Sequence, residues 1–344
     1  MTWLWGVALV VAAFAAHWGA EQLSEPLKAV RQRYGIAPAA GGVLVALASA
    51  SSDVAVNTVS AVRGVGQIGL GNLLGSNVAS IPLVVTAAYL ATRSKRLGGE
   101  GGGEDDGGEG DAHRRHVEQG LMRIEPGSVT VVALPYLGMV ALFAVLTAVP
   151  AWRGLQPIDG VILLGAYLVF LAQAVLRGRG EGEQVQWSTK KTWLAVGGLA
   201  ALAVGAVVIV TATQRIAGAF GIPPLVAGLF LTATMTALPA AFTTWAVTRS
   251  GQVTSGVSSP FGDNTVALTL GAVPLALVGL PVQDYPVYLT VLAFVALMPA
   301  VYAALVHRGR QGEHGLAGTH VLVLLAVLIA YGAATTAALL LGGG

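Results

Sequence analysis

GVLVALASASSDVAVNTVSAVRGVGQIGLGNLLGSNVAS, residues 42–80, and GLFLTATMTALPAAFTTWAVTRSGQVTSGVSSPFGDNTVA, residues 228–267, are two versions of one pattern. Each version is a pair of apolar segments of membrane length with acids, amides and hydroxyls set inside it. Such groups are costly in lipid, and their presence in two matching halves of a chain is typical of a transporter built from a repeat. The pattern therefore predicts a polar site enclosed by membrane helices.

The composition places the whole chain in the membrane. Apolar residues make up 55% and charged residues 10% of the sequence, and the mean hydropathy is +0.72; these values predict an integral membrane protein. The pI of about 9.0 does not indicate nucleic acid, because the basic residues cluster at the ends of apolar runs. The chain has no cysteine, which excludes disulfides and thiolate chemistry. The partners we expect are the lipid bilayer and small inorganic cations.

The apolar runs predict about ten membrane spans, because roughly 20 apolar residues cross a bilayer. Helices are expected, since lipid offers the backbone no hydrogen-bond partners and the runs are too long for barrel strands. The fold class predicted is an all-α integral membrane protein. The spans are expected near 3–24, 36–60, 67–92, 128–149, 156–176, 192–213, 221–247, 256–279, 285–306 and 319–341.

The basic residues predict the orientation of the spans. Of the 19 Lys and Arg residues, only Arg63, Arg153 and Arg215 fall outside if the N-terminus is outside. Both termini are therefore expected outside, in the plasma membrane of a prokaryote. The first apolar run lacks a basic leading region and a clear cleavage site, so it is kept as a span beginning near Met1.

A hydrophilic segment divides the first half of the chain. The expected organisation is membrane helices over 1–92, a cytoplasmic loop over 93–127, helices over 128–176, a linker over 177–191 and helices over 192–344. Gly98–His116 is rich in glycine and acids, so it is expected to be disordered. Its acids lack the spacing of a calcium loop. Five of the six histidines have no partners at metal-ligand spacing and are interpreted as loop or interface residues: His113, His116, His307, His314 and His320.

Two carboxylates stand apart from all the others. Asp53 and Asp263 are expected deep within spans, one in each copy of the repeat, where an unpaired carboxylate is costly or becomes protonated. Residues four apart share a helix face, and this periodicity puts polar side chains beside each acid. The candidate cation ligands are Asp53, Asp263, Ser49, Asn57, Asn72, Ser76, Asn77, Ser80, Thr236 and Asn264. Carboxylate, amide and hydroxyl oxygens are the ligands that hard cations prefer.

A structural role competes with ion binding for the uncharged members of this set. Ser, Thr and Asn often join membrane helices through hydrogen bonds worth about 1 kcal/mol each. The glycine-rich segments Gly69–Asn77 and Pro260–Asn264 are expected to break helices or to let them approach closely. Pro239 is expected to bend its span beside the site.

Short motifs recur in both halves of the chain, within about 36–92 and 221–279. They are Gly35–Pro38 with Gly42 and Gly71–Asn77 in the first half, and Gly221–Pro224, Gly228 and Thr236–Pro239 in the second. These residues resemble the two α-repeats of the sodium/calcium exchangers of the calcium/cation antiporter superfamily. The resemblance implies two inverted five-helix halves, with the second, third, seventh and eighth spans holding the ions and the first and sixth sliding across them. It also implies antiport of Ca²⁺ or another cation against Na⁺ or H⁺, without a cofactor.

The acids depart from the family pattern. Asp53 stands where the family's first glutamate is expected, and Ala240 stands where the second is expected. Asp263 occupies the place of a serine in the second repeat, corresponding to Ser76 in the first. Two carboxylates are retained, so the resemblance still implies cation binding, while calcium selectivity stays open.

Three functions remain open on the residues alone. Two carboxylates neutralise one Ca²⁺, or exchange Na⁺ for protons, so a calcium antiporter and a Na⁺/H⁺ exchanger both fit. Ala240 also leaves room for a transport-inactive structural relative. An intramembrane aspartyl protease fits least, because neither Asp53 nor Asp263 lies in a YD or GxGD motif.

Overall fold

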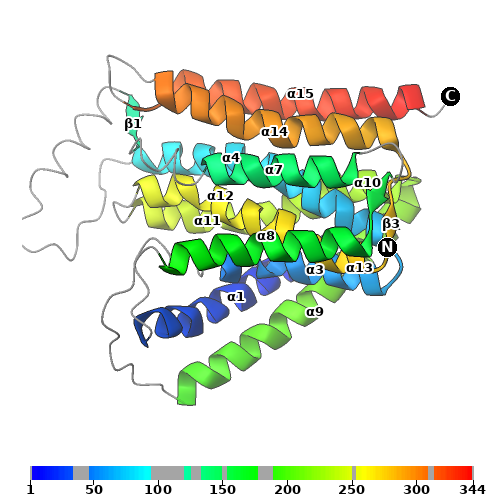
Figure 1. Cartoon of the computed structure of the whole chain (residues 1–344), viewed down its shortest axis with the longest axis horizontal. Helices are drawn as coiled ribbons and strands as arrows, with labels where there is room; N and C mark the ends of the chain where they lie inside the picture. The colour runs from blue at the N-terminus through cyan, green and yellow to red at the C-terminus, as the bar shows by residue number, and fades with distance from the viewer. Residues whose placement is uncertain are drawn as a thin grey trace, which may run out of the picture. The chain divides into compact units, whose positions relative to one another are not determined.

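The computed structural model describes residues 2–33, 46–93, 120–124, 133–148, 153–176, 189–249, 253–308 and 314–342, most of them helical. The predicted loop Gly98–His116, most of the linker 177–191 and the family-like residues Gly35–Gly42 lie outside these residues. The helices, drawn in Figure 1, are α1 (Thr2–Arg33), α3 (Ser51–Val62), α4 (Gly66–Thr92), α7 (Leu134–Thr147), α8 (Pro157–Leu176), α9 (Thr189–Phe220), α10 (Pro224–Ala227), η2 (Gly228–Thr232), α11 (Ala233–Arg249), α12 (Val253–Thr269), α13 (Val273–Leu277), α14 (Tyr285–Arg308) and α15 (Gly318–Gly342).

The helices confirm the predicted fold class. Each of the ten predicted spans coincides with a helix, or with a run of helical segments, in the described part of the chain. Six of the stretches described are long and apolar enough to cross a membrane, among them Thr2–Ser24, Thr189–Phe220 and Pro224–Arg249. The chain is an all-α membrane protein with a ten-helix plan.

Three details of the predicted spans are wrong. Helix α1 continues to Arg33, past the expected end at residue 24, because a helix keeps its backbone hydrogen bonds after it leaves the apolar layer. The second span is interrupted at Ala50, so Asp53 lies in the first turn of α3 rather than deep in a helix. The eighth span stops at Thr269 and resumes at Val273 as α13.

The glycine-rich segments do not break their helices. Gly69–Asn77 lies within α4 and Pro260–Asn264 within α12. The irregular backbone occurs elsewhere: Gly228–Thr232 is a π-helical turn, closed by the Ala233 amide bonding to the Gly228 carbonyl. Such turns are uncommon and are found frequently at functional sites. Pro239 lies inside α11, which follows this turn.

The described chain forms two compact units, and the first holds both acids. It comprises Met1–Asn77, Leu142–Pro239 and Gly262–Gln283. Within it, α1 packs along α9. A Cβ added at Gly198 would lie 2.6 Å from the Gln22 Cβ and 2.8 Å from the Gly19 carbonyl oxygen. The two backbones therefore approach closely, as small residues allow in membrane helix pairs.

Close approach also joins the two repeats within this unit. A Cβ at Gly71 of α4 would lie 2.3 Å from the Leu225 carbonyl oxygen, and one at Gly75 would lie 2.4 Å from that of Leu229. Only glycine permits this crossing of α4 with α10 and η2. The prediction of close helix approach in Gly69–Asn77 is thus confirmed, and the crossing fixes α4 against the segment that leads into α11.

The second unit comprises Val78–Ala141, Ala240–Phe261 and Asp284–Gly344. Its core includes Phe261, whose ring lies 5.9 Å from that of Tyr136 and 4.8 Å from that of Tyr302 between centroids. A short strand β1 (Leu121–Arg123) pairs antiparallel with β4 (Gly315–Ala317). In the first unit, β2 (Gly154–Leu155) pairs antiparallel with β3 (Leu280–Pro281).

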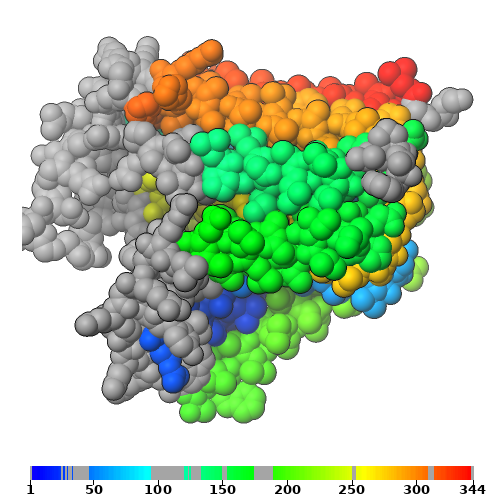
Figure 2. All heavy atoms as spheres, viewed as in Figure 1, coloured from blue at the N-terminus to red at the C-terminus, as the bar shows by residue number. Residues whose placement is uncertain are grey.

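The outer surface of the helices is apolar. Helix α8 faces the viewer in Figure 2 and exposes Ile158, Val161 and Val169. Trp193 and Val204 of α9 are also exposed. Large exposed apolar faces are unusual for proteins in water, whereas lipid accommodates them. The surface agrees with the membrane class inferred from composition.

Candidate functional site

Asn72 is the centre of a hydrogen-bond network that joins the two repeats. Its Nδ2 donates to Asp53 Oδ1 at 3.0 Å and to Asn57 Oδ1 at 3.1 Å. Its Oδ1 accepts from the Thr236 hydroxyl at 3.1 Å. Both amide protons are used, so the orientation of the Asn72 side chain is determined. Asn72 is fully buried, and it holds the Asp53 carboxylate in place.

Asn57 extends this network to the broken eighth span. Its Nδ2 donates to the Gly271 carbonyl oxygen at 3.1 Å, between the end of α12 and the start of α13. A helix terminus leaves carbonyl groups without partners, and Asn57 satisfies one of them. Its Oδ1 accepts from Asn72, and an amide oxygen has two lone pairs, so Asn57 supports the network and its ligand role stays a prediction.

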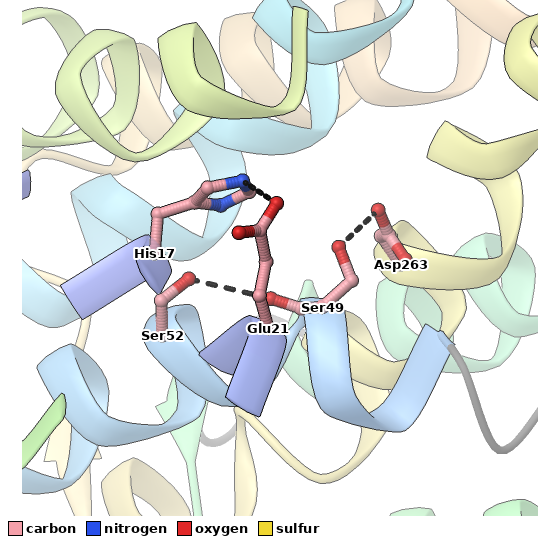
Figure 3. Close-up of polar contacts among 5 residues, drawn as sticks. All are labelled: His17, Glu21, Ser49, Ser52 and Asp263. Carbon is pink, nitrogen blue, oxygen red and sulfur yellow. Dashed lines mark hydrogen bonds and ion pairs between the residues drawn. The ribbon is translucent and has the colours of Figure 1, made fainter. Parts of the chain in front are cut away.

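Asp263 is held by a different residue. The Ser49 hydroxyl donates to Asp263 Oδ2 at 2.9 Å, and Figure 3 shows the two side chains pointing toward one another from the Ser49 segment and from α12. Ser52 donates to the Ser49 carbonyl oxygen at 3.4 Å. Ser49 lies just before the interruption at Ala50, so the irregular backbone places its hydroxyl beside the acid of the other repeat.

The two carboxylates lie in one polar cluster. Asp53 and Asp263 are partly buried, and Ser49, whose hydroxyl donates to Asp263, precedes Asp53 by about one helical turn. They belong to the same unit as Ser49, Asn72 and Thr236. Two carboxylates with hydroxyl and amide oxygens around them match the ligands that hard cations take. A cation bound between two negative charges lowers their mutual repulsion, so the arrangement suits a cation.

Four further predicted ligands are buried, and the side chains of three of them bond to the backbone. The Ser76 hydroxyl and Asn77 Nδ2 both donate to the Leu73 carbonyl oxygen, at 3.4 Å and 2.6 Å. Asn264 Nδ2 donates to the Asn77 carbonyl oxygen at 3.3 Å. Ser80 lies one turn further along α4, in the second unit, and is 7% exposed. The bonds of the first three residues support the helices, so for this whole set a ligand role stays a prediction.

His17 and Glu21 of α1 lie near the Ser49 segment, although they are not among the residues predicted from the sequence. His17 Nε2 lies 3.4 Å from Glu21 Oε1, and Figure 3 shows this pair in the same region as Ser49, Ser52 and Asp263. Glu21 lies near the end of a predicted span, so its position in the sequence does not distinguish it from the acids of the loops. The signal available in the sequence was the His and Glu spacing of four residues within an apolar run.

Comparison with known proteins identifies the family. The family model described as "Sodium/calcium exchanger protein" matches residues 4–176 and 190–338. The chain belongs to the sodium/calcium exchanger family. The two matched regions of this exchanger-family chain correspond to its two halves, as the resemblance of the α-repeats implied. No curated protein matches the chain.

Solved structures show the same fold. The exchanger-family chain is similar to the sodium-calcium exchanger NCX_Mj soaked with 100 mM Na⁺ and 10 mM Sr²⁺, with 19% identity, a TM-score of 0.63, and coverage of 97% of this chain and 99% of that chain. The same protein soaked with 2.5 mM Na⁺ and 10 mM Sr²⁺ gives a TM-score of 0.62 with the same identity and coverage. At 2.5 mM Na⁺ and 0.1 mM Ca²⁺ the TM-score is 0.58 at 18% identity, with the same coverage.

Proposed function

We propose that this chain is a secondary active antiporter that exchanges Ca²⁺ or another cation for Na⁺ or H⁺ by alternating access. The observation that carries the proposal is that the acids of the two repeats share one polar cluster: Asn72 donates to Asp53, and Ser49, about one helical turn before Asp53, donates to Asp263. Membership of the sodium/calcium exchanger family supports it. The soaks of NCX_Mj with Na⁺, Sr²⁺ and Ca²⁺ suggest which ions to test first.

The binding step depends on the two carboxylates. Asp53 and Asp263 supply two negative charges, and Ser49 and Thr236 lie beside them to supply hydroxyl oxygens. One divalent cation, two monovalent cations or two protons balance this charge. Occupancy by one kind of ion therefore excludes the others, because a doubly negative site that holds more positive charge is destabilised. Mutually exclusive occupancy is the condition for coupled exchange.

The access step is assigned to α1 and α9. These helices pack against one another through close contacts at Gly198 and Gly19, so they are expected to move as a pair. The cluster that lines this pair includes Ala16 and Ile209 and also takes in Val56 of α3, which follows Asp53 by one turn. Smooth apolar contacts of this kind permit sliding without loss of hydrogen bonds. Movement of the pair past α3 would open the carboxylates to one side and then to the other.

The test is cation uptake by proteoliposomes that contain the pure protein. Labelled Ca²⁺ is supplied outside, with an outward Na⁺ gradient, an outward H⁺ gradient or neither. Uptake that depends on a gradient supports the antiporter and names its counter-ion. Absence of Ca²⁺ uptake and of Na⁺-driven pH change in the same vesicles contradicts it and leaves the transport-inactive relative.

A specific residue favours a second candidate, a Na⁺/H⁺ exchanger with the same fold. Ala240 offers no oxygen where the family carries its second glutamate, so α11 contributes no carboxylate to the ligand set. Fewer oxygens disfavour Ca²⁺, which takes six to eight. Na⁺-driven pH change without Ca²⁺ uptake in the same vesicles selects this candidate.

Location and orientation form part of the proposal. We place the chain in the plasma membrane of a prokaryote with both termini outside, on the basis of its Lys and Arg distribution. The sequence has no cysteine, so single cysteines can be added without a background. Thr2→Cys and Thr189→Cys, at the starts of α1 and α9, test it, and Thr189 is exposed. Labelling of Thr2→Cys by an impermeant maleimide in intact cells, with Thr189→Cys protected, supports the orientation. The reverse pattern contradicts it.

A further inference from the structure

The His17 and Glu21 side chains form a pair that the exchange mechanism does not use. His17 Nε2 lies 3.4 Å from Glu21 Oε1, and the side chains are 15% and 48% exposed. Both residues lie within the apolar stretch Thr2–Ser24. Ionisable groups inside such stretches are rare and generally face a polar route or a partner.

The pair lies on the part of α1 that packs with α3. Helix α1 contacts α3, and Ala16 and Ala20, which precede His17 and Glu21 by one residue each, share an apolar cluster with Val56 of α3. Figure 3 shows His17 and Glu21 in the same region as the Ser52 and Ser49 side chains. A cation held by the pair would therefore lie on the part of α1 that meets the helix of Asp53.

The separation of the two donor atoms fits a metal ion. Residues four apart on a helix place their side chains on one face, so His17 and Glu21 can chelate together. In a tetrahedral site with bonds of about 2.0–2.1 Å, two ligand atoms are about 3.4 Å apart. The observed Nε2 to Oε1 distance is 3.4 Å.

The donor types select the class of metal. Ca²⁺ and Mg²⁺ take oxygen ligands, whereas an imidazole nitrogen suits Zn²⁺, Co²⁺ and related transition-metal ions. The described residues contain no group of three or more His, Cys, Asp or Glu side chains that could hold a metal. Closed structural sites usually have four protein ligands, so a site with two ligands of these types would bind its metal exchangeably.

We propose that His17 and Glu21 form a binding site for a divalent transition-metal cation on α1, where this helix packs with α3 and α9. The site differs from the Asp53 and Asp263 cluster in its donor atoms and in its helix. A metal ion bound there links two turns of α1, a helix of the pair that is proposed to move during exchange. A metal ion bound to His17 and Glu21 is therefore expected to slow cation exchange. This effect on exchange rests on the proposed function, whereas metal binding by the pair does not depend on it.

The experiment measures Zn²⁺ binding to the full chain in detergent, without a histidine tag, by titration calorimetry. The test variants are His17→Gln and Glu21→Gln. The control is Asp284→Asn, the same change from carboxylate to amide at a residue just before α14. His307→Gln is a second control, because the rings of His307 and His314 lie close together, with centroids 5.6 Å apart.

The expected result is one Zn²⁺ site that each test variant weakens by about tenfold or more, as loss of a metal ligand requires, while both controls bind as the wild type does. The absorption spectrum of bound Co²⁺ should change in His17→Gln and not in His307→Gln. Wild-type affinity in both test variants overturns the proposal, as does loss of binding in His307→Gln alone. Size-exclusion profiles and melting temperatures confirm that each variant is folded.

A double variant separates this proposal from the proposed function. In Asp53→Asn/Asp263→Asn the transport cluster is removed, and the Zn²⁺ site on α1 is expected to remain. Loss of Zn²⁺ binding in that variant, together with retention in Glu21→Gln, places the metal at the aspartates and overturns the inference. Failure of proteoliposome transport in the wild type contradicts the exchanger proposal without affecting the calorimetric result.

Discussion

Gly71→Ala tests whether the crossing of the two repeats sets the geometry of the site. The added Cβ would lie 2.3 Å from the Leu225 carbonyl oxygen and 2.7 Å from the Leu229 amide nitrogen. Ordinary carbon–oxygen contacts are about 3.3 Å or more, so α4 and the segment at Leu225 must separate by about 1 Å. Both obstructing atoms are backbone, and therefore no side-chain rotation removes the clash.

The separation acts directly on the network around Asn72. The Thr236 hydroxyl donates to Asn72 Oδ1 at 3.1 Å, and an added displacement of about 1 Å takes this distance beyond hydrogen-bond range. Overpacking costs typically about 1–3 kcal/mol, against a gain of roughly 0.5–1 kcal/mol for replacing a helical glycine by alanine. We expect a lower melting temperature and at least a tenfold loss of gradient-driven uptake.

Gly165→Ala on α8 is the control, because a Cβ there meets nothing within 4 Å. It is expected to melt at the same or a slightly higher temperature and to transport normally. The assays are thermal unfolding in detergent and cation uptake in proteoliposomes. Normal uptake and an unchanged melting temperature in Gly71→Ala would refute the reasoning that this crossing positions Asn72 and Thr236.

Three further substitutions test the acids, their support and the α1–α9 contact. Asp53→Asn removes the charge but keeps an oxygen that accepts the Asn72 hydrogen bond. We expect a folded protein with about a hundredfold lower uptake, from a loss of ~3 kcal/mol in cation stabilisation. Normal uptake would exclude Asp53 from the site. Ser49→Ala removes the 2.9 Å hydrogen bond to Asp263 and should weaken cation binding about tenfold, measured as the concentration for half-maximal uptake. An unchanged value would show that Ser49 does not hold Asp263. In Gly198→Ala the added Cβ would lie 2.6 Å from the Gln22 Cβ, whereas in Gly197→Ala it meets nothing within 4 Å. Only Gly198→Ala should therefore lower the melting temperature and slow exchange. Equal behaviour of the two variants would argue against close packing of α1 on α9.

The carboxylates and the glycines were predictable from the sequence for the same physical reason. A charged group within a membrane span is costly, so an acid is easily recognised among apolar residues. A close contact between two helix backbones requires a small residue, so glycines in a span indicate where helices cross. Asp53, Asp263, Asn72 and Gly71 were all found in this way. The positions of the helix interruptions were not, because glycine and proline occur throughout these spans and most of them are accommodated without a break. Gly69–Asn77 stays helical while the chain breaks near Gly271, where Asn57 satisfies a carbonyl from another helix.

By itself the sequence determined the membrane class, the ten-helix plan, the repeat and the acids at its centre, because hydrophobic length and the cost of buried charge are properties of local segments. Only the tertiary structure decided which hydrogen bonds the polar groups make. Asn72 donates to Asp53, Asn57 donates to the Gly271 carbonyl, Ser49 donates to Asp263, and Ser76 and Asn77 bond to the Leu73 carbonyl of their own helix. Helical periodicity places all of these side chains on polar faces. It does not distinguish an oxygen that is free for a cation from one already used in a hydrogen bond, because that difference depends on contacts between residues far apart in the chain.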